Sequence, residues 1–150
     1  MGAEDKNIVR TNIRESGEKT EALFALHNMR RLFCNKVKHE MEAMEFPEDM
    51  ISDVEKAAGE AITNTRHAFN ENELTEVLKG DNISAEAVIR QDRVCITITD
   101  KGPQGVICER CTQPLDESGN GIKIMKTLTD FSIIANEPGH HSIMLTKTNA

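Results

Sequence analysis

Apolar residues in the first half of the chain recur at steps of three and four, the spacing of one face of an α-helix. A first helix is predicted from Ala22 to Met44, after a short strand at 8–13. Pro47 interrupts the pattern and can serve as the first residue of a second helix, whose apolar stripe runs over 51–69. The two helices are therefore expected to follow each other directly along the chain.

Much of the second half alternates apolar and polar residues with period two, which is typical of strands. The pattern predicts one β-hairpin from 85–90 and 94–99, a second from 131–135 and 143–145, and a helix between them around 122–128. The order of elements is then β-α-α-β-β-loop-α-β-β. It predicts an α+β fold, a two-layer α/β sandwich with a mixed, mostly antiparallel sheet and the helices on one face.

Length and composition limit what this chain can be. Residues 1–150 are expected to form one domain, and 38% hydrophobic with 29% charged residues is ordinary for a soluble globular protein. The net charge of -7 argues against direct nucleic-acid binding, because neutralising phosphates requires Lys and Arg. No apolar run reaches the length of a membrane span, and residues 1–6 lack the layout of a signal peptide, so a cytoplasmic location is expected.

Glu60 and Asn64 lie four residues apart on the second predicted helix, so both project from one face. The amide oxygen of Asn64 can ligate Mg²⁺, which prefers oxygen ligands. The carboxylate of Glu60 can orient or deprotonate a nucleophile. The same spacing also occurs on an ordinary solvated helix face, so the pair alone leaves both interpretations open.

Two further segments carry residues suited to a nucleotide. Asp100 ends a predicted strand and can accept a hydrogen bond from an exocyclic amine such as that of adenine, while Gly102 lets the backbone approach a ligand closely. Gly119 and Gly121 lie ahead of the third predicted helix, where backbone N–H groups and the helix dipole favour an anion. Taken singly, the first segment is compatible with an ordinary turn and the second with a flexible loop.

In this order and spacing, the segments resemble the GHKL ATPases, which share the Bergerat nucleotide-binding fold, and more closely the stand-alone anti-sigma-factor serine/threonine kinases. Residues 60–69 are similar to the N-box of that family, 96–102 to its strand and first glycine box, and 119–125 to its Gly-x-Gly-Leu-x-Leu-Met segment. Residues 130–145 look like the closing hairpin. The resemblance extends over about residues 8–147.

The resemblance implies roles for the matching positions. Glu60 would be the catalytic base or activating carboxylate, and Asn64 would hold Mg²⁺. Asp100 would contact adenine, with Gly102 beneath the base. Residues 101–118 would form a lid over the ATP. The other implied nucleotide-binding residues are Gly105, Gly119, Gly121, Ile122 and Ser142.

The chain departs from the family pattern in several places. Gly105 stands one residue later than the second glycine of the usual Asp-x-Gly-x-Gly box. His140 and His141 occupy positions where small glycines are common, and Ser142 stands in for the usual Thr. The polar segment 71–82 is longer than expected and could be a loop that contacts a partner.

Cys108 and Cys111 form a C-x-x-C pair within the implied lid. They could bind a metal together with His140 and His141, or act as a redox switch. They could also be two reduced thiols in a loop, since the spacing lacks the context of a zinc site or of a thioredoxin-like protein. The sequence leaves these interpretations open.

The resemblance implies a protein serine/threonine kinase of the anti-sigma type that uses ATP and Mg²⁺. It would sequester a sigma factor and phosphorylate an anti-anti-sigma partner, and a homodimer is expected. One alternative is a nucleotide-gated binding module without kinase activity. Another is an ATPase domain that acts on a histidine phosphoacceptor in another protein. Glu60 favours the kinase over the binding module.

Overall fold

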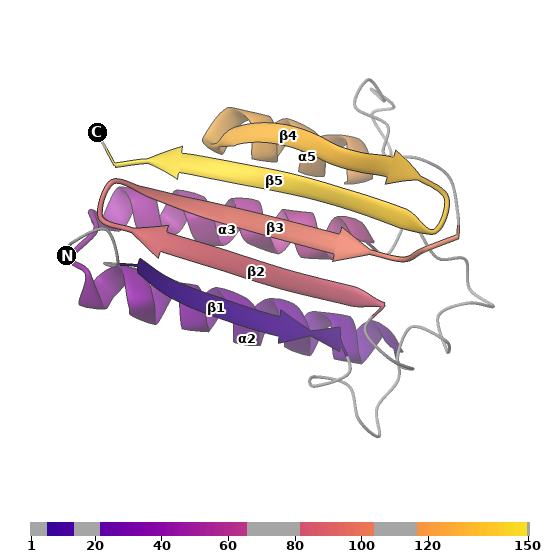
Figure 1. Cartoon of the computed structure of the whole chain (residues 1–150), viewed down its shortest axis with the longest axis horizontal. Helices are drawn as coiled ribbons and strands as arrows, with labels where there is room; N and C mark the ends of the chain where they lie inside the picture. Colours follow the sequence, from indigo (N-terminus) through magenta and orange to yellow (C-terminus); the bar gives the residue numbers. More distant parts are fainter. Residues whose placement is uncertain (1–5, 14–21, 66–81, 104–116, 150) are drawn as a thin grey trace.

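The computed structural model describes residues 6–13, 22–65, 82–103 and 117–149 of the chain, with the helices and strands arranged as in Figure 1. The order of these elements along the chain agrees with the predicted order. The elements are β1 (Lys6–Asn12), α2 (Ala22–Ala43), α3 (Glu48–Asn64), β2 (Ile83–Arg90), β3 (Arg93–Asp100), α5 (Glu117–Leu128), β4 (Asp130–Glu137) and β5 (His140–Thr148).

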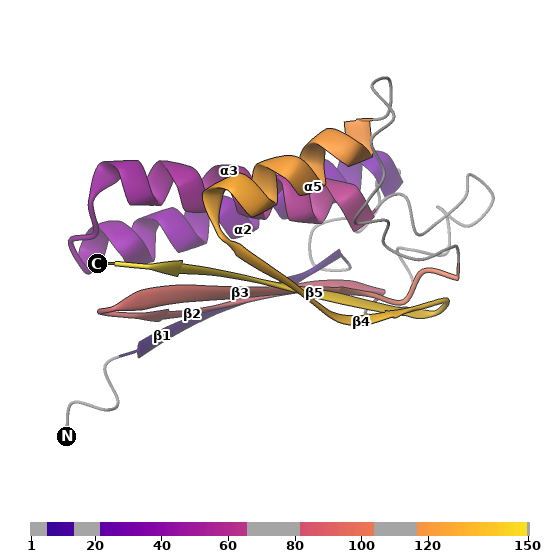
Figure 2. The same ribbon diagram turned by 90° about the horizontal axis from the view of Figure 1, so that it is seen from above.

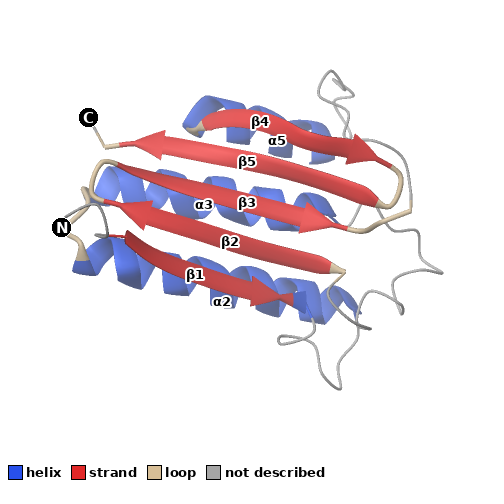
Figure 3. Ribbon diagram, viewed as in Figure 1, coloured by secondary structure: helices blue, strands red, loops and turns tan. Residues whose placement is uncertain are grey.

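The strands form one five-stranded sheet in the order β1-β2-β3-β5-β4. Each neighbouring pair is antiparallel, so the parallel pairing that a mixed sheet would contain does not occur among the described strands. The three described helices lie together on one face of this sheet, as Figure 2 shows from above and Figure 3 by element type. The predicted two-layer α+β sandwich is therefore confirmed. None of the described helices is long and apolar enough to span a membrane.

The core lies between the sheet and the helices. Burial alternates along β2 and β3, because successive side chains of a strand point to opposite faces and only one face is covered by helices. On the helix side, α3 lies between α2 and α5 and contacts both. Phe33, Met29 and Met125 are fully buried, so Met and one Phe fill space that Trp and Tyr occupy in other proteins.

Several boundaries differ from the predicted ones. Pro47 does not begin α3 but precedes it, with φ -60 and ψ 144, and its carbonyl accepts the N–H of Ile51 at 3.1 Å. The helix predicted around 122–128 begins earlier, at Glu117. Pairing in the first hairpin is also longer than predicted, because the register continues from Arg90 opposite Arg93 to Ile83 opposite Asp100. The predicted end of the second helix, near Asn70, lies outside the described residues.

Candidate functional site

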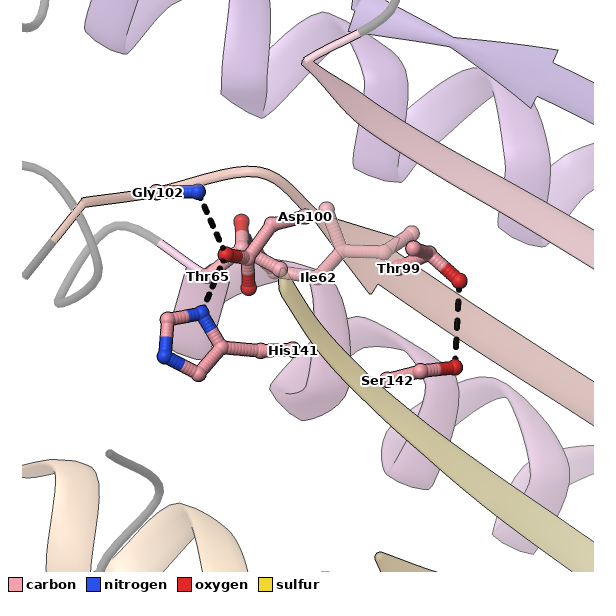
Figure 4. A network of polar contacts seen from close by, with 7 residues as sticks. All are labelled: Ile62, Thr65, Thr99, Asp100, Gly102, His141 and Ser142. Carbon is pink, nitrogen blue, oxygen red and sulfur yellow. Dashed lines mark hydrogen bonds and ion pairs between the residues drawn. The ribbon is translucent and has the colours of Figure 1, made fainter. Parts of the chain in front are cut away.

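Some of the predicted site residues, namely Asn64, Asp100 and Gly102, lie at one end of the sandwich. β3 ends there at Asp100 and β5 begins there, and the last turn of α3 lies across from them on the helix layer (Figure 1). Figure 4 shows Asp100 and Gly102 beside His141, with Thr65 from the end of α3 close by. The sandwich therefore brings together the helix and strand segments that are separated by several dozen residues in sequence.

Asp100 is buried and its carboxylate is held by two hydrogen bonds. The register pairs Asp100 with His141 on the neighbouring strand, so both side chains point to the helix layer. His141 Nδ1 lies 2.7 Å from Asp100 Oδ1, and the backbone N–H of Gly102 donates to the same oxygen at 2.9 Å. Because both contacts engage Oδ1, the second oxygen, Oδ2, can accept a hydrogen bond from a ligand.

The surroundings of Asp100 act on its ionisation in opposite directions. Burial raises the pKa of this carboxyl above its ordinary value, because the charged form loses its hydration. The hydrogen bonds from His141 and from the Gly102 N–H, and the positive charge that His141 and His140 can carry, work against that rise in the pKa. The ionised form of Asp100 therefore depends on its immediate neighbours.

The backbone that follows Asp100 is fixed on two sides. Lys101 N–H donates to the carbonyl of Asn82 at 2.9 Å, and the carbonyl of Gly102 accepts the N–H of Gly139 at 2.7 Å. Gly139 lies in the turn between β4 and β5 with φ +88, a conformation that side chains with a Cβ rarely adopt. The turn predicted at residues 138–139 therefore supports the segment in which Gly102 is buried.

Asn64 and Glu60 both lie on the last turns of α3, four residues apart, and each is half-buried. Asn64 Oδ1 is buried and has no hydrogen-bond partner among the described residues. The end of the helix is closed by Thr65, whose hydroxyl donates to the carbonyl of Ile62 at 2.6 Å. An unpartnered amide oxygen costs about 1–3 kcal/mol in a folded protein, and a hard cation such as Mg²⁺ is a chemically suitable partner for it.

Ser142 and Ile122 do not lie with Asp100 on the described surface of the site. Ser142 pairs in register with Thr99, and the two hydroxyl oxygens are 3.1 Å apart on the face of the sheet that is opposite the helices. Ile122 is 5% exposed and belongs to the apolar core. The nucleotide contacts predicted for Ser142 and Ile122 stay predictions.

The remaining predicted positions are two glycines near the start of α5 and several residues that precede this helix in the sequence. Gly119 and Gly121 lie within this helix, which begins at Glu117, rather than ahead of it as predicted. Gly105, Cys108 and Cys111 lie outside the described residues. Within the described part of the chain, no cluster of His, Cys, Asp and Glu side chains is arranged to hold a metal ion.

His141 is a residue to which the sequence assigns no contact with Asp100. By the family resemblance it is one of two His residues at positions where small glycines are common, and Ser142 is the predicted nucleotide contact. The structure shows that His141, not Ser142, shares a face with Asp100. The signal that could have identified it is the register of the β3–β5 pair, which was not available from the sequence of either strand alone.

Residues 24–147 match the family model described as "Histidine kinase-like ATPase domain". The Anti-sigma F factor of Clostridium beijerinckii is 31% identical over 107 residues, which cover 66% of this chain and 71% of that protein. The family match includes the ends of α3 and β3, and therefore both Asn64 and Asp100.

Proposed function

Since the chain belongs to the family of histidine kinase-like ATPase domains, we propose that it is an ATP-binding anti-sigma regulatory factor with protein serine/threonine kinase activity. It phosphorylates a Ser or Thr of an anti-anti-sigma partner and sequesters a sigma factor, in the cytoplasm and as a homodimer. The likeness to an anti-sigma F factor supports this assignment. ATP with Mg²⁺ is the phosphoryl donor.

The observation that carries the proposal is Oδ1 of Asn64 on the last turn of α3, which is buried and has no hydrogen-bond partner among the described residues. Folded proteins pair almost all of their buried polar atoms, and a bound ion is one explanation of an exception. Mg²⁺ takes oxygen ligands and is usually held by one or two protein groups together with substrate phosphates. The amide oxygen at the end of α3 fits that requirement.

The proposal gives several residues at this end of the sandwich a role in binding ATP or in transferring its phosphoryl group. Oδ2 of Asp100 accepts a hydrogen bond from the exocyclic amine of adenine, and the buried backbone at Gly102 lies beneath the base. Glu60 lies on the same face of α3 as Asn64, where it orients the partner's hydroxyl and accepts the hydroxyl proton. When bound, Mg²⁺ neutralises charge that develops on the phosphates. Backbone N–H groups near Gly119 and Gly121 contact phosphate, and residues 101–118 form the lid.

The experiment that tests the proposal combines the purified full chain with radiolabelled Mg-ATP and candidate anti-anti-sigma proteins. Acid-stable label on a Ser or Thr of the partner is the expected result, because phosphoserine and phosphothreonine survive acid whereas phosphohistidine does not. Glu60→Gln is expected to bind ATP but transfer no label, since it keeps the shape of the side chain and removes the base.

Two other outcomes would replace this function with a different one. Nucleotide binding with no transfer to any partner, together with nucleotide-dependent binding of the sigma factor, would support a binding module without kinase activity. Acid-labile label on a partner's His would support an ATPase domain that serves an external phosphoacceptor. Undiminished transfer by Glu60→Gln would remove Glu60 from the catalytic machinery.

A further inference from the structure

His141 occupies an unusual position for an ionisable side chain. It is 3% exposed, it lies opposite Asp100 in the β3–β5 register, and its Nδ1 is 2.7 Å from Asp100 Oδ1 (Figure 4). A His inside a protein is maintained only when its ring nitrogens have partners, because burial of an unpaired polar group is costly. The buried carboxylate of Asp100 supplies such a partner, and the two side chains form one hydrogen-bonded pair.

The geometry of this pair determines which carboxylate oxygen meets a ligand. His141 and the Gly102 N–H both contact Oδ1, and these contacts hold the plane of the carboxylate from two directions. Neither contact engages Oδ2, so this oxygen is available to a nucleobase. When Asp100 is ionised, the Nδ1–H of His141 donates to it, and the only role left for Oδ2 toward a base is that of an acceptor.

We infer that His141 is a positioning residue that makes the site select adenine over guanine, by holding Asp100 as an ionised, acceptor-only carboxylate. This inference rests on the proposed function, since it requires a purine nucleotide at this end of the sheet. Adenine presents an amine donor at N6, whereas guanine presents the acceptor O6 at the corresponding position. An ionised Asp100 accepts from N6 and repels O6, whereas a protonated Asp100 can donate to O6.

The protonation of Asp100 is therefore the property that His141 controls. Burial favours the neutral acid, and the hydrogen bond and charge of His141 oppose this effect. The other described titratable group that acts on Asp100 is His140, which is exposed and acts only through its charge. From β2, the residue opposite Asp100 is the apolar Ile83, which contributes no charge. Removal of His141 is thus expected to raise the pKa of Asp100 further and to weaken the preference for adenine.

The experiment measures the affinities of the full chain for Mg-ATP and Mg-GTP by calorimetry, between about pH 6 and about pH 8, where a His changes charge. His141→Leu is expected to reduce the ATP-over-GTP preference by about tenfold or more, the effect of losing a hydrogen bond to a charged group. In His141→Asn the amide nitrogen stands near the position of Nδ1 and can donate without titrating. This variant is expected to keep most of the preference. The matched control His140→Leu removes only a charge that does not contact Asp100, and it is expected to keep nearly all of the preference.

A second readout does not depend on the nucleotide. The carboxyl carbon of Asp100 is titrated by NMR in the free protein, and its midpoint is expected to rise in both His141 variants, more in the Leu variant than in the Asn variant. If the Leu variant does not fold, the titration midpoint of Asp100 in the Asn variant tests the inference. An unchanged midpoint, or an unchanged preference in His141→Leu, would overturn the inference. If wild type binds neither nucleotide, the proposed function fails, while the titration still reports whether His141 controls Asp100.

Discussion

Replacing Asn64 by Ala is expected to make the free protein more stable and at the same time unable to bind Mg-ATP. Asn64 Oδ1 is buried without a hydrogen-bond partner in the described part of the chain, and it sits on the last turn of α3. An unsatisfied buried polar atom costs about 1–3 kcal/mol. Ala also has a higher helix propensity than Asn, by up to about 0.7 kcal/mol in a helix interior and less at a helix end.

The removal of the unsatisfied atom and the higher helix propensity of Ala both stabilise the variant, and the loss of packing by the half-buried side chain offsets a small part of this gain. We therefore expect Asn64→Ala to raise the free energy of unfolding by about 1–2 kcal/mol. For a chain of this size that corresponds to a rise in Tm of roughly 2–6 °C. Urea unfolding of the nucleotide-free protein, followed by circular dichroism, measures the change directly.

Saturating Mg-ATP is expected to reverse the order of stability. A ligand that binds only the folded state stabilises it by about 2.7 kcal/mol at one hundred times its Kd, and wild type gains this whereas the variant does not. The matched control is Asn35→Ala, because Asn35 is an exposed Asn in the interior of α2 and reports helix propensity alone. A variant that is less stable than wild type without nucleotide, or one that Mg-ATP stabilises equally, would refute the reasoning.

Three other positions give sharp tests. The stability of wild type relative to Asp100→Asn is expected to be greatest below the ordinary Asp pKa of 3.8 and to fall as the pH rises through the raised pKa of the folded state, because the folded protein binds the proton more tightly. Urea unfolding at several pH values measures this difference in stability, and a difference that grows with pH would contradict the prediction. Gly59→Ala is expected to be nearly neutral, because the new Cβ would lie 2.7 Å from Arg30 Nε and displace this side chain, whose Nη1 donates to the Thr63 hydroxyl at 3.0 Å. In an Arg30→Ala background the same substitution is expected to stabilise the protein by about 1 kcal/mol, and equal effects in both backgrounds would show that Arg30 is not the obstacle. Burial raises the pKa of the Cys34 thiol to about 11, so iodoacetamide should label it only in unfolded protein, and rapid labelling of native protein detected by mass spectrometry would contradict that.

The elements of this fold were predictable because their signals are local. The apolar stripes of α2 and α3 and the period-two alternation of β2 and β3 follow from helix and strand geometry, and each can be recognised within a window of a dozen residues. The break at Pro47 and the turn at Gly139 follow from backbone restrictions of single residues. The boundaries were less accurate, because the ends of elements depend on capping and packing that a periodic pattern does not record.

The site was predictable as far as its residues carry chemistry that matches the family boxes. Asp100 and Gly102 lie together as expected, and Asn64 lies across from them at the end of α3. His141 could not be found in this way, because its partner is 41 residues away and depends on a strand pairing that is not sequential. A shift of register by one residue would place Ser142 opposite Asp100 and turn His141 to the outer face.

The same non-local pairing explains why the chain can keep a buried His next to a buried Asp. Each side chain alone would lose hydration without compensation, whereas together they satisfy each other at 2.7 Å. Because the two side chains are in contact, we expect a substitution at either position to change the protonation of the other. If Asp100 contacts adenine as we propose, it does so as one member of this pair. A ligand at Oδ2 is then expected to respond to the state of His141, because the β3–β5 register holds the two side chains face to face.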